Sequence, residues 1–176
     1  DFFGWLEENI NLIASADETP LNTAACEHIA FKNCETKFNV VKADEKESNL
    51  RQILNLGHTA GRAMETLLGY TMTHGECVAV GMVIQAEIAL DLKFISSDEK
   101  DAIYALIKKA GLPTEIPSSV SLEDLVIKMR TDKKARQGKI RWVLQDGIGA
   151  MKNFENGSYS IALEESYILK ILQANF

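Results

Sequence analysis

The chain has 176 residues, of which 46% are hydrophobic and 25% charged, a composition typical of a globular domain. Its 19 Lys and Arg residues against 25 Asp and Glu residues give a formal net charge of −6, which argues against nucleic acid or an anionic membrane as a partner. The longest apolar stretch, Cys77 to Ile84, is too short to span a membrane, so we expect a single cytoplasmic domain over residues 1–176.

Helical periodicity runs through the first three quarters of the chain. Apolar residues recur at helical spacing from Phe2 to Ile13, and a second helix is predicted from about Leu21 to Lys37. We expect these two segments to form an antiparallel helical hairpin. A long helix is then predicted from about Asn49 to Leu68, where Gly69 ends it.

Two capping boxes mark the helices that follow. In each, a Thr or Ser is followed three residues later by Glu, first at Thr73 and Glu76 and then at Ser96 and Glu99. The segment behind Thr73 is apolar on every side, which predicts a central helix. The helix that opens at Ser96 is predicted to end at Ala110.

The last quarter of the chain changes character. A shorter helix is predicted from Ser121 to about Arg130, and Ile140–Leu144 then alternates like a strand. Asp146-Gly147 is a hairpin signal, and Ser158–Leu163 is predicted to add another strand before a last helix. The sequence therefore predicts a mainly α fold, a multi-helix domain with a small β hairpin or sheet.

Polar side chains between residues 47 and 65 form an unusual set. In a continuous helix with 3.6 residues per turn they would fall within an arc of about 80°. The set is Glu47, Arg51, Asn55, His58, Arg62 and Glu65. A solvent-exposed amphipathic face is one interpretation, but such faces are usually built from Lys and Glu. Guanidinium, amide and imidazole groups instead suit a carboxylate or phosphate ligand.

The opposite side of the same segment carries two glycines among apolar residues. Gly57 and Gly61 are four residues apart, and each costs about 1 kcal/mol of helix propensity relative to alanine. This cost indicates that another backbone approaches closely there.

Two histidines are candidates for metal ligands. His58 and His74 are 16 residues apart, which suits two helices joined by a short turn. Neutral imidazoles that converge from adjacent helices would supply two of the three protein ligands typical of a catalytic divalent-metal site. His28 has no comparable context and is interpreted as a surface or packing residue.

These residues together carry a family resemblance. The motifs are Asp44-Glu45-x-Glu47-x-x-x-Arg51, Leu54-Asn55-Leu56-Gly57-His58-Thr59, His74-Gly75-Glu76-x-Val78-Ala79-x-Gly81-Met82 and Asp132-Lys133-Lys134. The chain resembles the C-terminal domain of the 3-dehydroquinate synthases, NAD- and metal-dependent enzymes of the shikimate pathway of aromatic amino acid biosynthesis. The resemblance spans most of the chain.

The resemblance implies a lyase reaction on a phosphorylated seven-carbon sugar acid, 3-deoxy-D-arabino-heptulosonate 7-phosphate, which loses phosphate and closes to 3-dehydroquinate. In that family NAD transiently oxidises one ring carbon, and zinc or cobalt held by two histidines and a glutamate binds substrate hydroxyls. His58 and His74 are the implied ligands. In the family, the glutamate and the NAD-binding domain precede the matched region. We therefore expect this chain to be the C-terminal part of the enzyme and to be inactive by itself, and we expect the full-length enzyme to be a homodimer.

The same resemblance implies substrate contacts, residue by residue. By motif, Arg51 would hold the substrate carboxylate and Asn55 would donate to the phosphate side. Lys37 and Glu47 would hold ring hydroxyls. These positive and hydrogen-bonding groups suit a doubly charged phosphate and a carboxylate.

Four further positions belong to this comparison. Arg62 stands where the family usually has a second histidine, so it is expected to bind phosphate but cannot act as a base near neutral pH. Asn49 stands where glycine is common, a minor change if its φ is positive. One of Lys133 and Lys134 is expected to join the pocket.

Several alternatives stay open. They are other sugar-phosphate cyclases, such as those making 2-epi-5-epi-valiolone or 2-deoxy-scyllo-inosose, metal-dependent alcohol or glycerol dehydrogenases, and a non-catalytic helical paralogue. The dehydrogenases need no phosphate or carboxylate clamp. The cluster of Arg51, Asn55 and Arg62, with the Asp132-Lys133-Lys134 block, therefore favours a cyclase.

Overall fold

The computed structural model of the protein describes residues 2–14, 22–131 and 139–176. The elements, in chain order, are α1 (Phe2–Asn9), the 3-10 helix η1 (Ile10–Leu12), α2 (Thr23–Ala43), the 3-10 helix η2 (Leu50–Asn55), α3 (His58–Leu67), α4 (His74–Asp91), α5 (Ser97–Lys109), α6 (Leu122–Thr131), β1 (Arg141–Trp142), β2 (Ile161–Ala162) and α7 (Glu165–Asn175). The predicted mainly α fold with a small β element is confirmed. None of the described helices has the length and hydropathy needed to cross a membrane.

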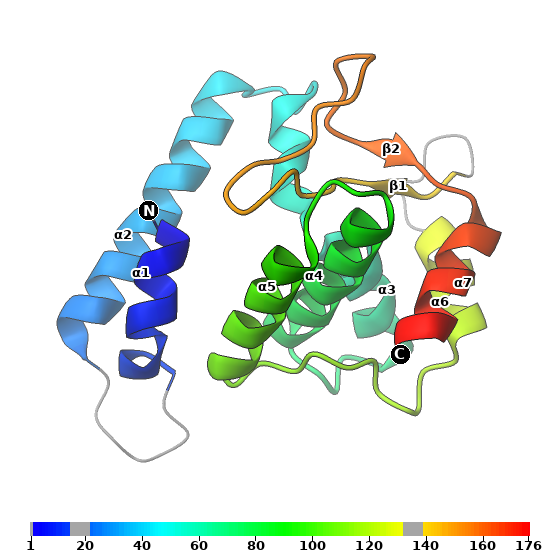
Figure 1. The fold of residues 1–176 in the computed structure, drawn as a ribbon, viewed down its shortest axis with the longest axis horizontal. Coiled ribbons are helices and arrows are strands. Elements are labelled where there is room, and N and C mark those ends of the chain that lie inside the picture. The colour runs from blue at the N-terminus through cyan, green and yellow to red at the C-terminus, as the bar shows by residue number, and fades with distance from the viewer. Residues whose placement is uncertain (1, 15–21, 132–138) are drawn as a thin grey trace.

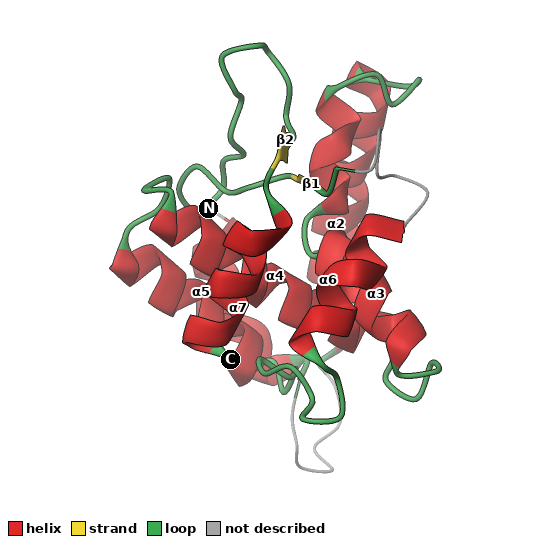
Figure 2. Ribbon diagram, turned by 90° about the vertical axis from the view of Figure 1, so that its right-hand side faces the viewer, coloured by secondary structure: helices red, strands yellow, loops and turns green. Residues whose placement is uncertain are grey.

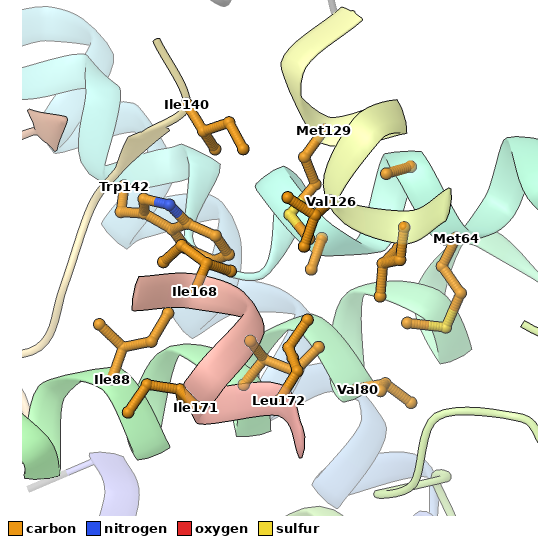
Figure 3. Packing of buried hydrophobic residues seen from close by; sticks show 14 of the residues in the cluster. Met64, Val80, Ile88, Val126, Met129, Ile140, Trp142, Ile168, Ile171 and Leu172 are labelled. Atoms are coloured by element: carbon orange, nitrogen blue, oxygen red, sulfur yellow. The ribbon is translucent and has the colours of Figure 1, made fainter. Parts of the chain in front are cut away.

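Helix α4 is the central element, as its apolar sequence predicts. It packs against α3, α5 and α7 (Figure 1). The main core lies between α3, α4, α6, α7 and β1, and Leu125 is fully buried in it. Met64, Trp142 and Ile168 are also fully buried there (Figure 3). Large apolar side chains from distant parts of the sequence thus hold the helices around α4.

The first two helices stand to one side of this bundle as an antiparallel pair (Figure 1). Helix α2 continues past the predicted end at Lys37 to Ala43. The ring of His28 lies against Trp5, with their centroids 4.3 Å apart. His28 is therefore a packing residue, as its context indicated.

Both capping boxes form, so the local signals at the starts of α4 and α5 are confirmed. The Thr73 hydroxyl accepts the Glu76 backbone N–H, and Ser96 accepts that of Glu99 in the same way. Hydrogen bonds from Thr73 lower the pKa of the Glu76 carboxyl. A negative charge is thereby favoured at the positive end of α4.

The continuous helix predicted from Asn49 to Leu68 is wrong. The 3-10 helix η2 ends at Asn55, and α3 begins at His58 after a break at Gly57. Gly57 has a φ of 77°, a left-handed conformation that the absence of a side chain permits. The polar residues therefore do not form one helical stripe.

A buried amide stabilises the break. The N–H of Gly57 donates to Oε1 of Gln85 on α4, and Nε2 of Gln85 donates to the carbonyl of Val143 at 2.5 Å. Gln85 is fully buried, so both ends of its amide need such partners. This side chain joins the start of α3 to the segment that follows β1.

The glycines let the backbones of α3 and α4 come into contact. A Cβ atom added to Gly61 would lie 2.9 Å from the Cys77 carbonyl oxygen, and one added to Gly81 would lie 1.9 Å from the Gly57 carbonyl oxygen. The close backbone approach predicted from Gly57 and Gly61 is confirmed, with α4 as the partner. Only glycine fits at such a crossing.

The β element is smaller than predicted. Arg141 pairs with Ala162 and Trp142 with Ile161 in an antiparallel ladder at one end of the bundle (Figure 2). Beyond β1, the Asp146 N–H donates to the Ala150 carbonyl at 3.1 Å, which closes the turn expected at Asp146-Gly147. The ladder brings residues 156–160 over η2, and this placement forms one wall of the site.

Candidate functional site

A pocket of about 670 Å³ opens between η2, α3, β1 and residues 156–160. Four of the predicted site residues line it, namely Glu47, Asn55, His58 and Arg62. Lys46 and Arg141 line it as well. Among the described lining residues there are thus three cationic side chains and one carboxylate. A chain with an overall negative charge therefore has a positively charged pocket suited to an anion.

His58 lines the pocket, and the ring of His74 lies against it although His74 is not among the lining residues. The two histidines begin different helices, α3 and α4. Their ring centroids are 5.2 Å apart, with the ring planes at 61°. The Nδ1 atom of His58 lies 2.9 Å from the carbonyl oxygen of Leu56. A carbonyl can only accept, so Nδ1 carries the proton and Nε2 is the nitrogen suited to a metal.

His74 is oriented by a carboxylate. Its Nδ1 atom lies 3.0 Å from Oε2 of Glu65, whose side chain is only 20% exposed. A carboxylate that holds the second nitrogen of an imidazole is a typical outer partner of a metal-binding histidine. Glu65 belongs to the predicted polar set, but it contacts His74 and does not line the pocket.

The neighbouring cysteine is not suited to the same role. Cys77 is fully buried in α4, and burial raises the pKa of its thiol, with further contributions from the charges of Glu65 and Glu76.

Within residues 2–14, 22–131 and 139–176, no group of three or more His, Cys, Asp or Glu side chains is placed to hold a metal ion. The two histidines thus could supply only part of the ligand set of a metal ion.

Asp44 organises the loop that carries Glu47. Its carboxylate accepts hydrogen bonds from the backbone N–H groups of Arg51, Asn49 and Ser48 and from the Ser48 hydroxyl. The backbone N–H groups, that of Arg51 most strongly, hold the pKa of Asp44 well below its ordinary value. This network holds Glu47 at a φ of 53°, a conformation that residues with side chains rarely adopt.

Asn49 does not adopt the left-handed conformation that would suit a position where glycine is common. Its φ is −157°, and the positive φ in this loop belongs to Glu47 instead. The Asn49 side chain reaches across the pocket wall, where Nδ2 donates to the Gly157 carbonyl at 2.7 Å and Oδ1 accepts the Tyr159 N–H at 3.1 Å. The side chain therefore ties two loops together.

The remaining predicted site residues lie elsewhere. Lys37 is exposed on α2 and does not line the pocket. Arg51 donates through Nη1 to the Glu45 carbonyl at 3.0 Å and is also absent from the lining. Lys133 and Lys134 lie outside the described residues. The structure thus gathers Glu47, Asn55 and Arg62, with the histidine pair beside them.

Sequence reasoning missed Arg141. It follows no recognised motif and lies far along the chain from η2 and α3. The sequence feature that could have pointed to Arg141 is its place in an alternating segment beside a predicted hairpin. Such a place predicts a strand but does not indicate a function. Only the pairing of β1 with β2 places it at the pocket.

Residues 1–135 match the family described as 3-dehydroquinate synthase C-terminal. The 3-dehydroquinate synthase of Thermoanaerobacter sp. (strain X514) is 40% identical over 174 residues, covering 98% of this chain and 45% of that protein. The 3-dehydroquinate synthase of Nostoc punctiforme is 45% identical over 124 residues, covering 70% and 34%. The chain therefore spans less than half the length of these relatives.

Solved structures share the fold. A 2-epi-5-epi-valiolone synthase from Streptomyces hygroscopicus subsp. jinggangensis, with NAD+ and Zn2+ bound, matches with a TM-score of 0.78 and 20% identity, over 98% of this chain and 45% of that one. A 2-deoxy-scyllo-inosose synthase complexed with carbaglucose-6-phosphate, NAD+ and Co2+ matches with a TM-score of 0.74 and 23% identity, over 99% and 51%. At these identities the likeness establishes the fold alone.

Proposed function

The chain belongs to the 3-dehydroquinate synthase family and comprises its C-terminal domain, and from this premise we propose that it is the metal- and substrate-binding part of a 3-dehydroquinate synthase. The proposed reaction is the lyase conversion of 3-deoxy-D-arabino-heptulosonate 7-phosphate to 3-dehydroquinate and phosphate. The observation that carries this proposal is the oriented pair of His58 and His74 at the edge of a positively charged pocket.

The histidine geometry fits a divalent metal. Two imidazoles bound at about 2.0–2.1 Å to one tetrahedral zinc ion would have ring centres roughly 5 Å apart. The observed separation is 5.2 Å. His58 and His74 would bind through Nε2, since Leu56 and Glu65 lie against their Nδ1 atoms. Fold neighbours with Zn2+ or Co2+ support zinc or cobalt as the metal.

The bound metal would act as a Lewis acid toward substrate hydroxyls, and NAD would supply the transient oxidation. This chain's own residues would bind and orient the substrate. Arg62 would hold a phosphate oxygen, Asn55 would donate to the same side and Glu47 would accept from ring hydroxyls. Because a guanidinium group is not a base near neutral pH, we propose that the substrate phosphate itself accepts the proton that must be removed.

Other assignments rest on the resemblance. Lys37, Arg51 and one of Lys133 and Lys134 are proposed as further substrate contacts. The third metal ligand and the NAD-binding domain are proposed to come from a preceding part of the same protein, since the relatives are more than twice as long as the matched region. A homodimer in the cytoplasm is the proposed form of the full-length enzyme.

Phosphate release from the seven-carbon substrate by the full-length protein tests the proposal, together with its zinc and cobalt content. His58→Ala should abolish both metal retention and phosphate release. His28→Ala is the matched control, because His28 packs against Trp5 away from the pocket. A wild-type protein without metal and a His58→Ala variant without loss would together contradict the proposal. Oxidation of an alcohol without phosphate release would instead indicate a dehydrogenase.

A further inference from the structure

Arg141 extends the anion-binding machinery of the pocket. We propose that Arg141 binds an oxyanion of the substrate, either its phosphate or its carboxylate, and that residues 156–160 hold the guanidinium in place for this purpose. The inference rests on the proposed function and adds to it a substrate contact that none of the family motifs contains. It assigns no role in the proton or hydride steps.

Neutral groups of Ser158 and Ser160 hold the guanidinium in place. Its Nε donates to the Ser160 hydroxyl at 2.9 Å, and its Nη2 donates to the Ser160 carbonyl at 2.6 Å and to the Ser158 hydroxyl at 3.4 Å. No carboxylate of the described residues pairs with it, and Nη1 makes no hydrogen bond to any of them. Within the described part of the chain, Arg141 thus brings to the pocket a positive charge that no carboxylate pairs with, together with two remaining N–H donors.

The serines are themselves held from across the pocket. The Ser160 hydroxyl donates to Oε1 of Gln52 at 2.6 Å. Asn49 makes two more bonds to this segment, one to the Gly157 carbonyl and one from the Tyr159 N–H. These contacts fix the segment before any ligand arrives, so little conformational entropy remains to be lost on binding.

The backbone of Arg141 is anchored beside the histidine pair. The Thr59 hydroxyl, one residue after His58, donates to the Arg141 carbonyl at 3.0 Å, and Arg141 pairs with Ala162 in the β ladder. The guanidinium therefore has a defined position relative to His58. A substrate with a phosphate and a carboxylate needs more than one fixed cation, and Arg141 adds one to Arg62.

Binding of the two proposed products to the full-length protein tests the inference without turnover. In calorimetric titrations, Arg141→Gln should lower the affinity for inorganic phosphate or for 3-dehydroquinate about 10- to 100-fold. This is the effect expected for the loss of one charge-assisted hydrogen bond. Loss of phosphate binding alone would identify a phosphate contact, and loss of 3-dehydroquinate binding alone would identify a carboxylate contact. Arg130→Gln is the matched control, because Arg130 lies on α6 and pairs with Glu165.

Two more variants separate binding from folding. Arg141→Lys keeps the charge and should recover part of the lost affinity, and unchanged metal content would show that each variant is folded. Asn49→Gly removes the hydrogen bonds to Gly157 and Tyr159, which help to hold the segment that positions Arg141. Because Arg141 is proposed to bind substrate only, this variant should raise the KM of the enzyme more than it lowers kcat. Wild-type affinity of Arg141→Gln for both products would overturn the inference, whereas an active wild-type enzyme would still leave the proposed function standing.

Discussion

Gly81 is the position where α4 and α3 have least room, so Gly81→Ala tests whether their packing sets the site. The added methyl group would lie 1.9 Å from the Gly57 carbonyl oxygen and 3.0 Å from the Gly61 nitrogen. Cβ atoms essentially never come within 3.0 Å of such atoms. The helices would therefore have to separate by about 1 Å at this point, since a close-packed interior has no space to absorb the clash.

The expected loss of stability follows from two opposing effects. Alanine favours a helix over glycine by about 1 kcal/mol. Overpacking costs about 1–3 kcal/mol and occasionally more, and the obstacle at Gly81 is backbone that cannot rotate away. With overpacking at the upper end of its range, about 3 kcal/mol, less about 1 kcal/mol of helix propensity, we expect the free energy of unfolding of this domain to fall by about 2 kcal/mol. For a domain of 150–250 residues this lowers the Tm by about 4–8 °C.

Thermal unfolding followed by circular dichroism measures this effect, with metal content measured on the same samples. Gly75→Ala is the matched control, because it lies on the same helix and an added Cβ would meet nothing within 4 Å. Gly81→Ala should also retain less metal, since a displaced α4 moves His74 away from His58. A Gly81→Ala variant with the Tm of Gly75→Ala would refute the reasoning.

Two other variants probe the carboxylates around the site. Glu65→Gln should weaken metal binding by about 10- to 100-fold, as measured by competition with a chelator, because the carboxylate orients His74; unchanged affinity would contradict that role. Asp44→Asn should be less stable than the wild type at neutral pH. The lowered pKa of Asp44 stabilises the fold above the ordinary aspartate pKa of about 4, and this stabilisation is lost as the pH falls below it. Urea unfolding at about pH 7 and about pH 3 should therefore show a shrinking difference between the two proteins, and a constant difference would argue against the Asp44 network.

Local signals predicted most of the helices. The capping boxes at Thr73 and Ser96 involve residues three apart, so their chemistry is complete within a few residues of sequence. Gly57 and Gly61 predicted a close neighbour because their cost in helix propensity needs compensation. The sequence could not name α4 as that neighbour, since the contact depends on how the chain turns between them.

The errors occurred where distant residues decide the conformation. The break at Gly57 depends on the buried amide of Gln85, and periodicity alone cannot distinguish a broken helix from a continuous one. Asn49 likewise takes its role from Gly157 and Tyr159 at the other end of the chain. Arg141 lines the pocket because β1 pairs with β2. Strands of two residues are too short to give a recognisable pattern in the sequence.

Gln85 makes the two halves of the site mechanically dependent on each other. Its oxygen fixes the residue before His58, and its nitrogen fixes a carbonyl two residues after Arg141. A glutamate there could not donate, a lysine could not accept, and a leucine would leave both backbone groups unsatisfied. His58, proposed as a metal ligand, and Arg141, proposed as an anion contact, thus cannot shift independently, and damage to this one amide would misplace both at once.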